Sequence, residues 1–456
     1  MDLLGLQALQ PVSSSSIGGV AYVSVEPTHR PTCCPTCLSD QLHRHGTREQ
    51  KYNDVPHYGE PSVLVVHRKR WRCMRCKTLF PDPLPDIDEK RRCTKRLIEF
   101  VQSRIMEHTF SSISRDVGLS DVSIRHIFDD FVSTMEQKYH FQTPRFLGID
   151  EVKIIGQYRC ILTNVEKNTV YDLLPSRRIA DLRKYFANFE NPKDVEVFST
   201  DLWANYAAIA QEYFPHATVV ADRFHIQRMG TNGMESARKE VRKTLDRKDR
   251  LAMKDDRFIL LKHREKLTDQ QKAKLTEMLQ RFPTLQLAWE CKEQFMDVWK
   301  SDSRYDAEQA VDAWLAQTNE FTRVHFKEAV SAFTTRRNHI LNYFDVPVTN
   351  AYTESINRLA KSINRMGRGY SFEVVRAKMI YDTNAIDKGT LIKRAAEPKQ
   401  QDIFDSGKNV MSKVAFHPEK ETTEKVYYGA HIPTLCDKLE RGEFDHSNQS
   451  SEESSN

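Results

Sequence analysis

Residues 145–174 read RFLGIDEVKIIGQYRCILTNVEKNTVYDLL, and this stretch decides the fold. Three short apolar runs follow one another in it, each with the length and composition of a β-strand. The pattern continues downstream with helices at 178–190 and 203–213, each followed by another apolar run. The expected strands lie at 145–152, 157–165, 168–174, 194–200 and 217–222. This β-β-β-α-β-α-β order predicts an α/β domain built on a single sheet.

Three acidic residues belong to this pattern or follow it. Asp150 lies in Leu-Gly-Ile-Asp-Glu of the first strand, Asp201 follows the fourth strand in Ser-Thr-Asp-Leu-Trp, and Glu354 begins a helix in Thr-Glu-Ser-Ile-Asn. A single Asp after an apolar run is more commonly a strand-end or capping residue. Three carboxylates that converge from different elements are instead the ligands that Mg²⁺ prefers. The pattern therefore predicts a site for two Mg²⁺ ions, or Mn²⁺, of the kind that cleaves phosphodiesters.

Two further acids lie close to these positions in the sequence. Asp222, in Val-Val-Ala-Asp-Arg-Phe-His, ends the fifth expected strand and is a further candidate for the site. Glu151 follows Asp150 directly, but neighbouring side chains of a strand point to opposite faces of a sheet. We therefore expect Glu151 to lie outside the site.

A basic stripe follows Glu354 on the same predicted helix. From Ala351 to Lys378 the chain has six Lys or Arg against two Glu. Arg358, Lys361 and Arg365 recur at helical spacing, so they are candidates for holding DNA beside the carboxylates. A solvated basic face is an equally common reason for such a stripe.

Two Cys-x-x-Cys pairs lie near the start of the chain, Cys34-Pro-Thr-Cys37 and Cys73-Met-Arg-Cys76. Zinc prefers four soft ligands in a tetrahedron, and each pair supplies two of them from one tight turn. We expect a structural zinc ion here, with a hairpin filling the loop between the pairs. Cys33 is an alternative ligand because it is adjacent to Cys34. His43, His45 and His67 are less favoured substitutes.

The segment around the second pair is basic. Between Arg30 and Glu99 there are fifteen Lys or Arg against nine Asp or Glu, a local surplus larger than the net charge of +5 of the whole chain. This surplus suits a polyanion. The strand-like run before the second pair ends in His67-Arg-Lys-Arg-Trp-Arg, so Arg68, Lys69, Arg70 and Arg72 are candidate phosphate contacts. A basic strand is also often only a solvated sheet edge.

Residues 111–128 have the pattern of a helix-turn-helix. A first helix leads to a turn centred on Gly118, and Ser120 caps a second helix with an apolar stripe at Ile124, Ile127, Phe128 and Phe131. Ser123, Arg125 and His126 then lie on other faces, near the end that would enter a major groove. The alternative is an ordinary helical hairpin, but the neighbouring basic cysteine module favours binding of double-stranded DNA.

The rest of the chain sets the domain limits. From about residue 226 to 345 the strand signal disappears and long charged helical patterns replace it. The opening Met-Asp-Leu-Leu-Gly-Leu has no basic segment of the kind that starts a signal peptide, and no run reaches the ~18 apolar residues of a membrane helix. We therefore expect a cytoplasmic protein with no membrane partner.

These motifs together resemble the ISL-three family of bacterial insertion-sequence transposases, over nearly the whole chain from Cys34 to about Tyr381. The set, in chain order, is Cys-Pro-x-Cys, Arg-Cys-x-x-Cys, Leu-Gly-Ile-Asp-Glu, Ser-Thr-Asp-Leu-Trp, Val-Ala-Asp-Arg-Phe-His, Thr-Glu-Ser-Ile-Asn and Gly-Arg-Gly-Tyr-Ser-Phe. No member of the set is specific alone, but the set in this order is highly specific.

The resemblance implies an α/β ribonuclease-H-like catalytic core with a helical insertion, behind a zinc-ribbon-like module and a helix-turn-helix. It implies that Asp150, Asp201 and Glu354 form an Asp-Asp-Glu triad, supported by Asp222 and His225. It also implies a nucleoid-associated enzyme that binds the terminal inverted repeats of its element, cleaves there, and joins the 3′-hydroxyl to target DNA. Such enzymes act as dimers or larger synaptic assemblies. Two alternatives stay open, a non-catalytic DNA-binding regulator derived from a transposase, and a structure-selective nuclease of the same fold.

The expected domains follow from these limits. They are a zinc-binding module at 28–90, a helix-turn-helix domain at 91–142, the first part of the catalytic core at 143–229, the helical insertion at 230–345, the rest of the core at 346–395, and a C-terminal region with a polar, disordered tail at 396–456.

Overall fold

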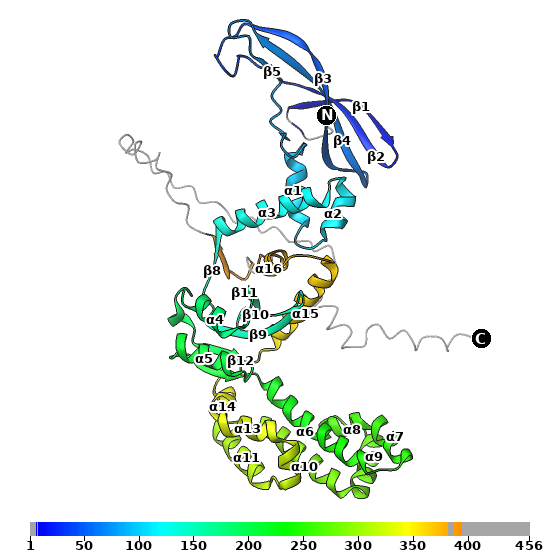
Figure 1. Cartoon of the computed structure of the whole chain (residues 1–456), viewed down its shortest axis with the longest axis vertical. Helices are drawn as coiled ribbons and strands as arrows, with labels where there is room; N and C mark the ends of the chain where they lie inside the picture. Colours follow the sequence, from blue (N-terminus) through cyan, green and yellow to red (C-terminus); the bar gives the residue numbers. More distant parts are fainter. Residues whose placement is uncertain (1–5, 7, 382–386, 394–456) are drawn as a thin grey trace, which may run out of the picture. The chain divides into compact units, whose positions relative to one another are not determined.

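The structure is a computed structural model that describes residue 6 and residues 8–381 and 387–393 (Figure 1). The C-terminal region expected at 396–456 lies outside the described residues. Within the described ranges, no helix is both long enough and apolar enough to cross a membrane.

A five-stranded mixed sheet lies at the centre of the α/β part, with strand order β11-β10-β9-β12-β13. β9, β10 and β11 are antiparallel neighbours, and β12 and β13 run parallel to β9. The strands are β9 (Phe146–Ile154), β10 (Gln157–Asn164), β11 (Thr169–Leu174), β12 (Val197–Thr200) and β13 (Thr218–Ala221). All five expected strands are therefore confirmed, with ends shifted by a few residues.

Helices cover both faces of this sheet. α4 (Ile179–Phe186) and α5 (Ala204–Tyr213) pack against the face that carries Leu147 and Ile149. α15 (Ala351–Gly367) and α16 (Phe372–Ile380) pack against the face that carries Val152. Because β9 alternates its side chains between the two faces, Asp150 lies on the α15 face, where Asn357 of α15 contacts it.

The region between β13 and α15 is helical, as the sequence predicts. α6 (Arg223–Lys243) leaves the sheet directly after β13 and packs against α10 and α13 around Phe295, Trp314 and Phe333. The other helices of this insertion are α7 (Arg247–Asp255), α8 (Arg257–Leu261), α9 (Asp269–Arg281), α10 (Pro283–Asp297), α11 (Arg304–Gln317), α12 (Glu320–His325), α13 (Lys327–Thr335) and α14 (Arg337–Asp345), with short 3-10 turns at Pro192–Asp194 before the insertion and at Arg264–Lys266 and Val298–Lys300 within it.

The helix-turn-helix pattern is confirmed as a structural element. α1 (Lys95–Arg104) is followed by α2 (Phe110–Val117), a left-handed Gly118 and α3 (Asp121–Lys138). The side chain of Ser120 accepts a hydrogen bond from the backbone N–H of Ser123 and so caps α3 as expected. The buried side of α3 carries Ile124, Ile127 and Phe128. α3 continues into β8 (Tyr139–Phe141), which pairs with β14 (Leu391–Lys393).

The N-terminal module is a sheet with strand order β1-β2-β4-β3-β7-β6, and β5 also pairs with β4. The hairpin expected between the two cysteine pairs is present as β3 and β4. The sheet also extends before residue 28, where the zinc-binding module was expected to begin, because β1 and β2 form a hairpin and β2 pairs with β4. The strands are β1 (Leu9–Ile17), β2 (Val20–Pro27), β3 (Leu42–His57), β4 (Glu60–Cys73), β5 (Leu79–Pro81), β6 (Ile87–Asp88) and β7 (Cys93–Thr94).

Candidate active site

The register of the parallel strands β9, β12 and β13 places three aspartates side by side. Ile149 of β9 is opposite Thr200 of β12, which is opposite Ala221 of β13. The next residues along the three strands are Asp150, Asp201 and Asp222, so the three acids lie on one level of the sheet. Neighbouring strands are about 4.8 Å apart, which makes Asp201 the immediate neighbour of both other aspartates.

Helix α15 is attached to these strands by the residue that precedes it. Asn350 is fully buried; its backbone N–H donates to Oδ1 of Asp222 at 3.3 Å and its side-chain Nδ2 donates to the carbonyl of Ile149 at 3.3 Å. A Cβ on Gly148 would approach Oδ1 of Asn350 to 2.9 Å and Oγ1 of Thr163 to 2.5 Å, so only glycine leaves room for this attachment. The start of α15 is thereby fixed relative to the strand ends.

Two residues of α15 face the carboxylates as a result. Asn357 donates from Nδ2 to Oδ2 of Asp150 at 2.8 Å. Glu354, one turn earlier, is close to Asp222 and His225, and one ligand atom from each of these three residues lies within 4.8 Å of the others. Nδ1 of His225 is 2.8 Å from Oδ2 of Asp222. The structure therefore gathers the supporting pair around Glu354, while Asp150 and Asp201 adjoin it along the sheet.

Burial and mutual repulsion favour the protonated acids in this site. The pKa of Asp150 is raised to about 7, chiefly by burial; the charge of His225 opposes this rise, and those of Asp201, Asp222 and Glu354 add to it. Burial also raises the pKa of Asp201 and of Glu354. His225 has a raised pKa, chiefly because it forms a hydrogen bond with Asp222. The positive charge of His225 is therefore not enough to stabilise all of these acids in their ionised form.

This set of groups suits a hard divalent cation. Buried carboxylates that repel one another are stabilised by a bound cation, and Mg²⁺ and Mn²⁺ favour oxygen ligands. Glu151 does not belong to the set, as expected, because its side chain forms an ion pair with Arg177, which stacks on Trp203 beside α5.

The four cysteines of the two Cys-x-x-Cys pairs come together at one point. Sγ of Cys34 is 3.5 Å from Sγ of Cys76, Sγ of Cys37 is 3.6 Å from Sγ of Cys73, and all four lie within 4.8 Å of one another. A zinc tetrahedron with Zn–S bonds of about 2.3 Å has S–S edges of about 3.8 Å. The cluster therefore fits a structural zinc ion, and Cys33 is not part of it.

The candidate DNA contacts of the N-terminal module differ in exposure. Arg70 and Arg72 are exposed on β4. Lys69 is partly buried, with its Nζ 3.9 Å from a carboxylate oxygen of Glu26. Arg68 is only 4% exposed, and its guanidinium donates to the carbonyl of Asp82 at 2.6 Å and to Glu89 at 2.9 Å. Arg68 is therefore a correction to the predicted set, because its side chain is used inside the module and does not reach a phosphate.

The other candidates lie on α3 and α15. Arg125 and His126 are exposed on α3, whereas Ser123 is half-buried and its hydroxyl contacts that of Ser120 at 2.9 Å. Arg358, Lys361 and Arg365 are exposed on α15. A hollow of about 820 Å³ is lined by Arg125 of the helix-turn-helix and by Arg365 of α15. Basic residues from two segments that are far apart in the sequence thus share one surface.

Sequence reasoning missed Asn350, Asn357 and Gly148. Asn357 belongs to the quoted motif Thr-Glu-Ser-Ile-Asn and follows Glu354 by three residues, which is the spacing of one helical face. That spacing was the available signal. Gly148 belongs to the motif Leu-Gly-Ile-Asp-Glu, and Asn350 lies three residues before Thr-Glu-Ser-Ile-Asn, but neither has chemistry that marks its role in a sequence.

Comparison with known proteins agrees with this layout. A family model described as "Transposase" matches residues 147–379, which is about half of the chain. Models described as "Helix-turn-helix domain of transposase family ISL3" and "zinc-finger of transposase IS204/IS1001/IS1096/IS1165" match residues 83–132 and 30–76. The chain is also 21% identical over 367 residues to the transposase for insertion sequence element IS1001 of Bordetella parapertussis, covering 77% of this chain and 89% of the relative.

Proposed function

Because the chain belongs to the ISL3 family of transposases, we propose that it binds the terminal inverted repeats of an insertion sequence, cleaves the DNA at these ends and transfers the 3′-hydroxyl to target DNA. Membership of the family and its DNA-binding helix-turn-helix account for DNA as the substrate. The catalytic proposal rests on one observation. Asp150, Asp201 and Asp222 lie side by side on neighbouring strands, and Glu354 approaches them from α15.

In this proposal Asp150, Asp201 and Glu354 bind two Mg²⁺ or Mn²⁺ ions. Such a pair of ions stabilises the attacking and the leaving oxygen of an in-line phosphoryl displacement. Asn357 donates to Oδ2 of Asp150, and the backbone N–H of Glu151 donates to Oδ1 at 2.7 Å, so both contacts orient this carboxylate. Asp222 accepts from the backbone of Asn350 and contacts His225, which fixes α15 and Glu354 relative to the strands.

DNA recognition is assigned to exposed basic side chains of three segments. Arg125 and His126, with Ser123 beside them, face outward near the N-terminal end of α3, the part of such a helix that enters a major groove. Lys69, Arg70 and Arg72 of β4 are assigned to phosphates, as are Arg358, Lys361 and Arg365 of α15. A protein that positions DNA in this way needs contacts both to phosphates and to bases.

Several finer features are part of the same proposal. The strand order and the helical insertion between Asp201 and Glu354 support a ribonuclease-H-like core. The domain limits given above, a location in the cytoplasm at the nucleoid, and action as a dimer or larger synaptic assembly stay predictions.

Substitution of Asp201 tests the proposal. We expect Asp201→Asn to abolish Mg²⁺-dependent cleavage of DNA from the gene's own flanking repeats, and to leave binding to that DNA largely intact. Asp181→Asn, on the exposed side of α4, is the matched control and should cleave like the wild type. Undiminished strand transfer by Asp201→Asn would refute the assignment. Cleavage without joining would indicate a nuclease, and binding without cleavage by the wild type would indicate a regulator.

A further inference from the structure

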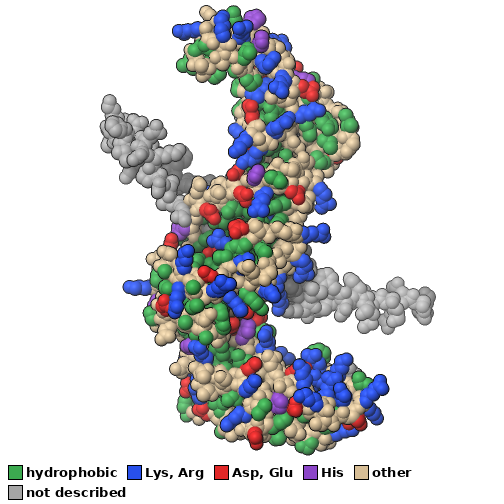
Figure 2. All heavy atoms as spheres, in the orientation of Figure 1, with side chains coloured by type: hydrophobic (Ala, Val, Ile, Leu, Met, Phe, Trp, Pro, Cys, Tyr) green, Lys and Arg blue, Asp and Glu red, His purple; other side chains and the backbone are tan. Residues whose placement is uncertain are grey.

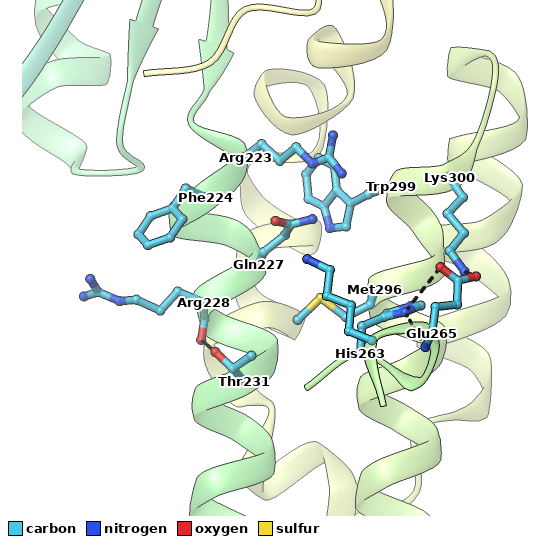
Figure 3. Close-up of a pocket in the computed structure, with 11 residues that line it drawn as sticks. Arg223, Phe224, Gln227, Arg228, Thr231, His263, Glu265, Met296, Trp299 and Lys300 are labelled. Carbon is cyan, nitrogen blue, oxygen red and sulfur yellow. Dashed lines mark hydrogen bonds and ion pairs between the residues drawn. The ribbon is translucent and has the colours of Figure 1, made fainter. Parts of the chain in front are cut away.

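A hollow of about 430 Å³ lies between the first turns of α6 and the other helices of the insertion (Figure 3). This volume is within the range of about 300–1,000 Å³ that is typical of sites for small ligands. α6 supplies one wall, the turn at Arg264–Lys266 another, and the region where α10 ends the third. The residues that matter below are Arg223, Phe224, Gln227, Arg228, Lys266 and Trp299.

The hollow adjoins the candidate active site on one helix. Asp222 caps α6, and its Oδ1 accepts from the backbone N–H of Phe224 at 3.3 Å. His225 contacts the same carboxylate, so site residues and hollow residues alternate along the first turn. Burial raises the pKa of Glu354, and the positive charge of Arg228 is among the effects that lower it. Arg228, which lines the hollow, is one helical turn after His225 on α6.

Three cations of the hollow have no acidic partner. Within the described residues no carboxylate forms an ion pair with Arg223, Arg228 or Lys266. Arg223 donates instead to the hydroxyl of Tyr343 at 2.8 Å. Arg228 and Lys266 are exposed. Unpaired cations around a hollow beside a phosphodiester-cleaving site suit the phosphates of the substrate.

Two aromatic residues of the hollow could contact a base, which phosphate binding alone would not require. Phe224 is 50% exposed, so half of its ring surface is open to a ligand. Trp299 is 6% exposed and stacks on Phe344, and its indole N–H has no hydrogen-bond partner in the part of the chain that the structure describes. Figure 3 shows the indole nitrogen of Trp299 turned into the hollow, near Gln227. An exposed ring and a free donor are what an unpaired base would use.

A basic surface continues beyond the hollow. From Arg238 to Lys274 the chain has fourteen Lys or Arg against seven Asp or Glu. Figure 2 shows these basic side chains gathered over the end of the insertion that carries α7, α8 and α9. DNA that left the carboxylates across α6 would meet further positive charge, which favours a path over this surface.

We propose that the hollow binds one unpaired nucleotide of the DNA strand next to the phosphodiester that is cleaved. Phe224 stacks on its base, the indole N–H of Trp299 donates to an acceptor on the base, and Arg228 and Lys266 bind the adjoining phosphates. This assignment rests on the proposed transposase function and adds a positioning role for the insertion. It predicts that the DNA is locally unpaired at that position, since a base in the duplex cannot reach the hollow.

Photo-crosslinking tests the assignment in the full-length protein. The probe is duplex DNA from the gene's own flanking repeats, with 5-iododeoxyuridine at one position at a time on either side of the cleavage junction, in buffer without Mg²⁺. We expect one position to give a crosslink that maps to the peptide containing Phe224. Phe224→Ala should lower the yield about 5- to 140-fold, the range for loss of one base stack, and Phe224→Tyr should restore it. Tyr305→Ala, at a ring that is 69% exposed on α11 and outside this basic surface, is the matched control.

The outcomes separate this assignment from the proposed function. Crosslinks that never map to α6, or equal yields from Phe224→Ala and Tyr305→Ala, would overturn the nucleotide site even if the wild type cleaves DNA when Mg²⁺ is added. A Phe224-dependent crosslink in a protein that never cleaves would support the nucleotide site and contradict the transposase activity.

Discussion

Asp150 is surrounded by other acidic side chains, and its raised pKa makes the stability of the protein depend on pH. Its pKa is about 7 in the folded protein, against about 3.9 in an unfolded chain. The folded state therefore binds the extra proton between about pH 4 and pH 7, and this stabilisation is lost as the pH rises through about 7. Without divalent metal, we expect the thermal midpoint of the wild type to fall as the pH rises from about 4 to about 7, and to level off above that.

Mg²⁺ and one substitution separate this effect from other titrations. Mg²⁺ at about pH 8 should raise the midpoint of the wild type, because the ionised carboxylates bind it. Asp150→Asn should show a smaller fall with pH and a smaller response to Mg²⁺, whereas the exposed Asp116→Asn should behave like the wild type. Identical pH dependence in Asp150→Asn and the wild type, measured by differential scanning fluorimetry, would contradict the proposed environment of Asp150.

Asn357 should matter to catalysis although it is not an acid. Its amide orients Asp150, and loss of such a partner typically costs about 10- to 100-fold in metal affinity or activity. We therefore expect Asn357→Ala to need correspondingly more Mg²⁺ for half-maximal cleavage. Asn364→Ala, two turns later on the same helix, is the matched control. An unchanged Mg²⁺ titration for Asn357→Ala would show that Asp150 needs no such support.

Among individual residues, the sequence could predict the positions that are marked by the residues next to them in the chain. Asp150, Asp201 and Asp222 could be predicted because each follows or ends an apolar run. Asn350 could not, because its role depends on contacts with strands more than a hundred residues away. Arg68 was assigned wrongly, although Leu64, Val66 and Arg68 follow the period-two pattern of one buried strand face.

At the scale of elements, the two zinc-binding turns have matching backbones. The N–H of Leu38 donates to the carbonyl of Cys34, and the N–H of Lys77 donates to that of Cys73, each at 2.9 Å. Leu38 and Lys77 both have a positive φ, so the two turns place their cysteines alike. Cys33 lies outside this arrangement, which resolves the ambiguity left by the adjacent Cys33 and Cys34.

A pair of substitutions tests which cysteine is the ligand. We expect about one zinc ion per chain in the wild type and in Cys33→Ser, and much less in Cys34→Ser, because a site with three thiolates binds zinc more weakly. Atomic absorption on the purified proteins gives the ratio. Loss of zinc from Cys33→Ser with retention in Cys34→Ser would reverse the assignment.

The end of α1 is connected to the catalytic part by a buried lysine. Lys378 of α16 donates from Nζ to the carbonyls of Ile105, Met106 and His108, the last at 3.0 Å. Lys378→Met would leave these carbonyls without a donor, at a cost of about 1–3 kcal/mol. We expect the free energy of unfolding in urea to fall by that amount, against less than about 0.5 kcal/mol for the exposed Lys193→Met. Equal effects of the two would contradict this role.

Most elements could be predicted from the sequence because periodicity is a local property. The five strands of the central sheet, the two helices between them and the helix-turn-helix all had clear patterns. The β1–β2 hairpin was missed, although Gly18 and Gly19, both with positive φ, form the kind of two-residue turn that joins such strands. The serines of β1 gave that strand no apolar alternation, because most of its side chains are exposed.

At the scale of the whole molecule, the order of parts follows from sequence but their contacts do not. The cysteine pairs, the helix-turn-helix and the carboxylates each have local signals in chain order. The hydrogen bond from the N–H of Phe110 to the hydroxyl of Tyr370, at 3.0 Å, joins residues 260 positions apart and has no such signal. Through this contact and those of Lys378 in α16, the helix-turn-helix region is joined to the segment that follows α15.

The most direct test of the account is whether the chain cleaves and joins DNA with the help of Glu354. Wild type, Glu354→Gln and the exposed control Glu373→Gln are incubated with Mg²⁺, labelled DNA from the gene's flanking repeats and a target plasmid. We predict cleaved ends and joined products with the wild type and Glu373→Gln, and neither with Glu354→Gln, although all three bind the DNA. Joined products at undiminished yield from Glu354→Gln would contradict the account.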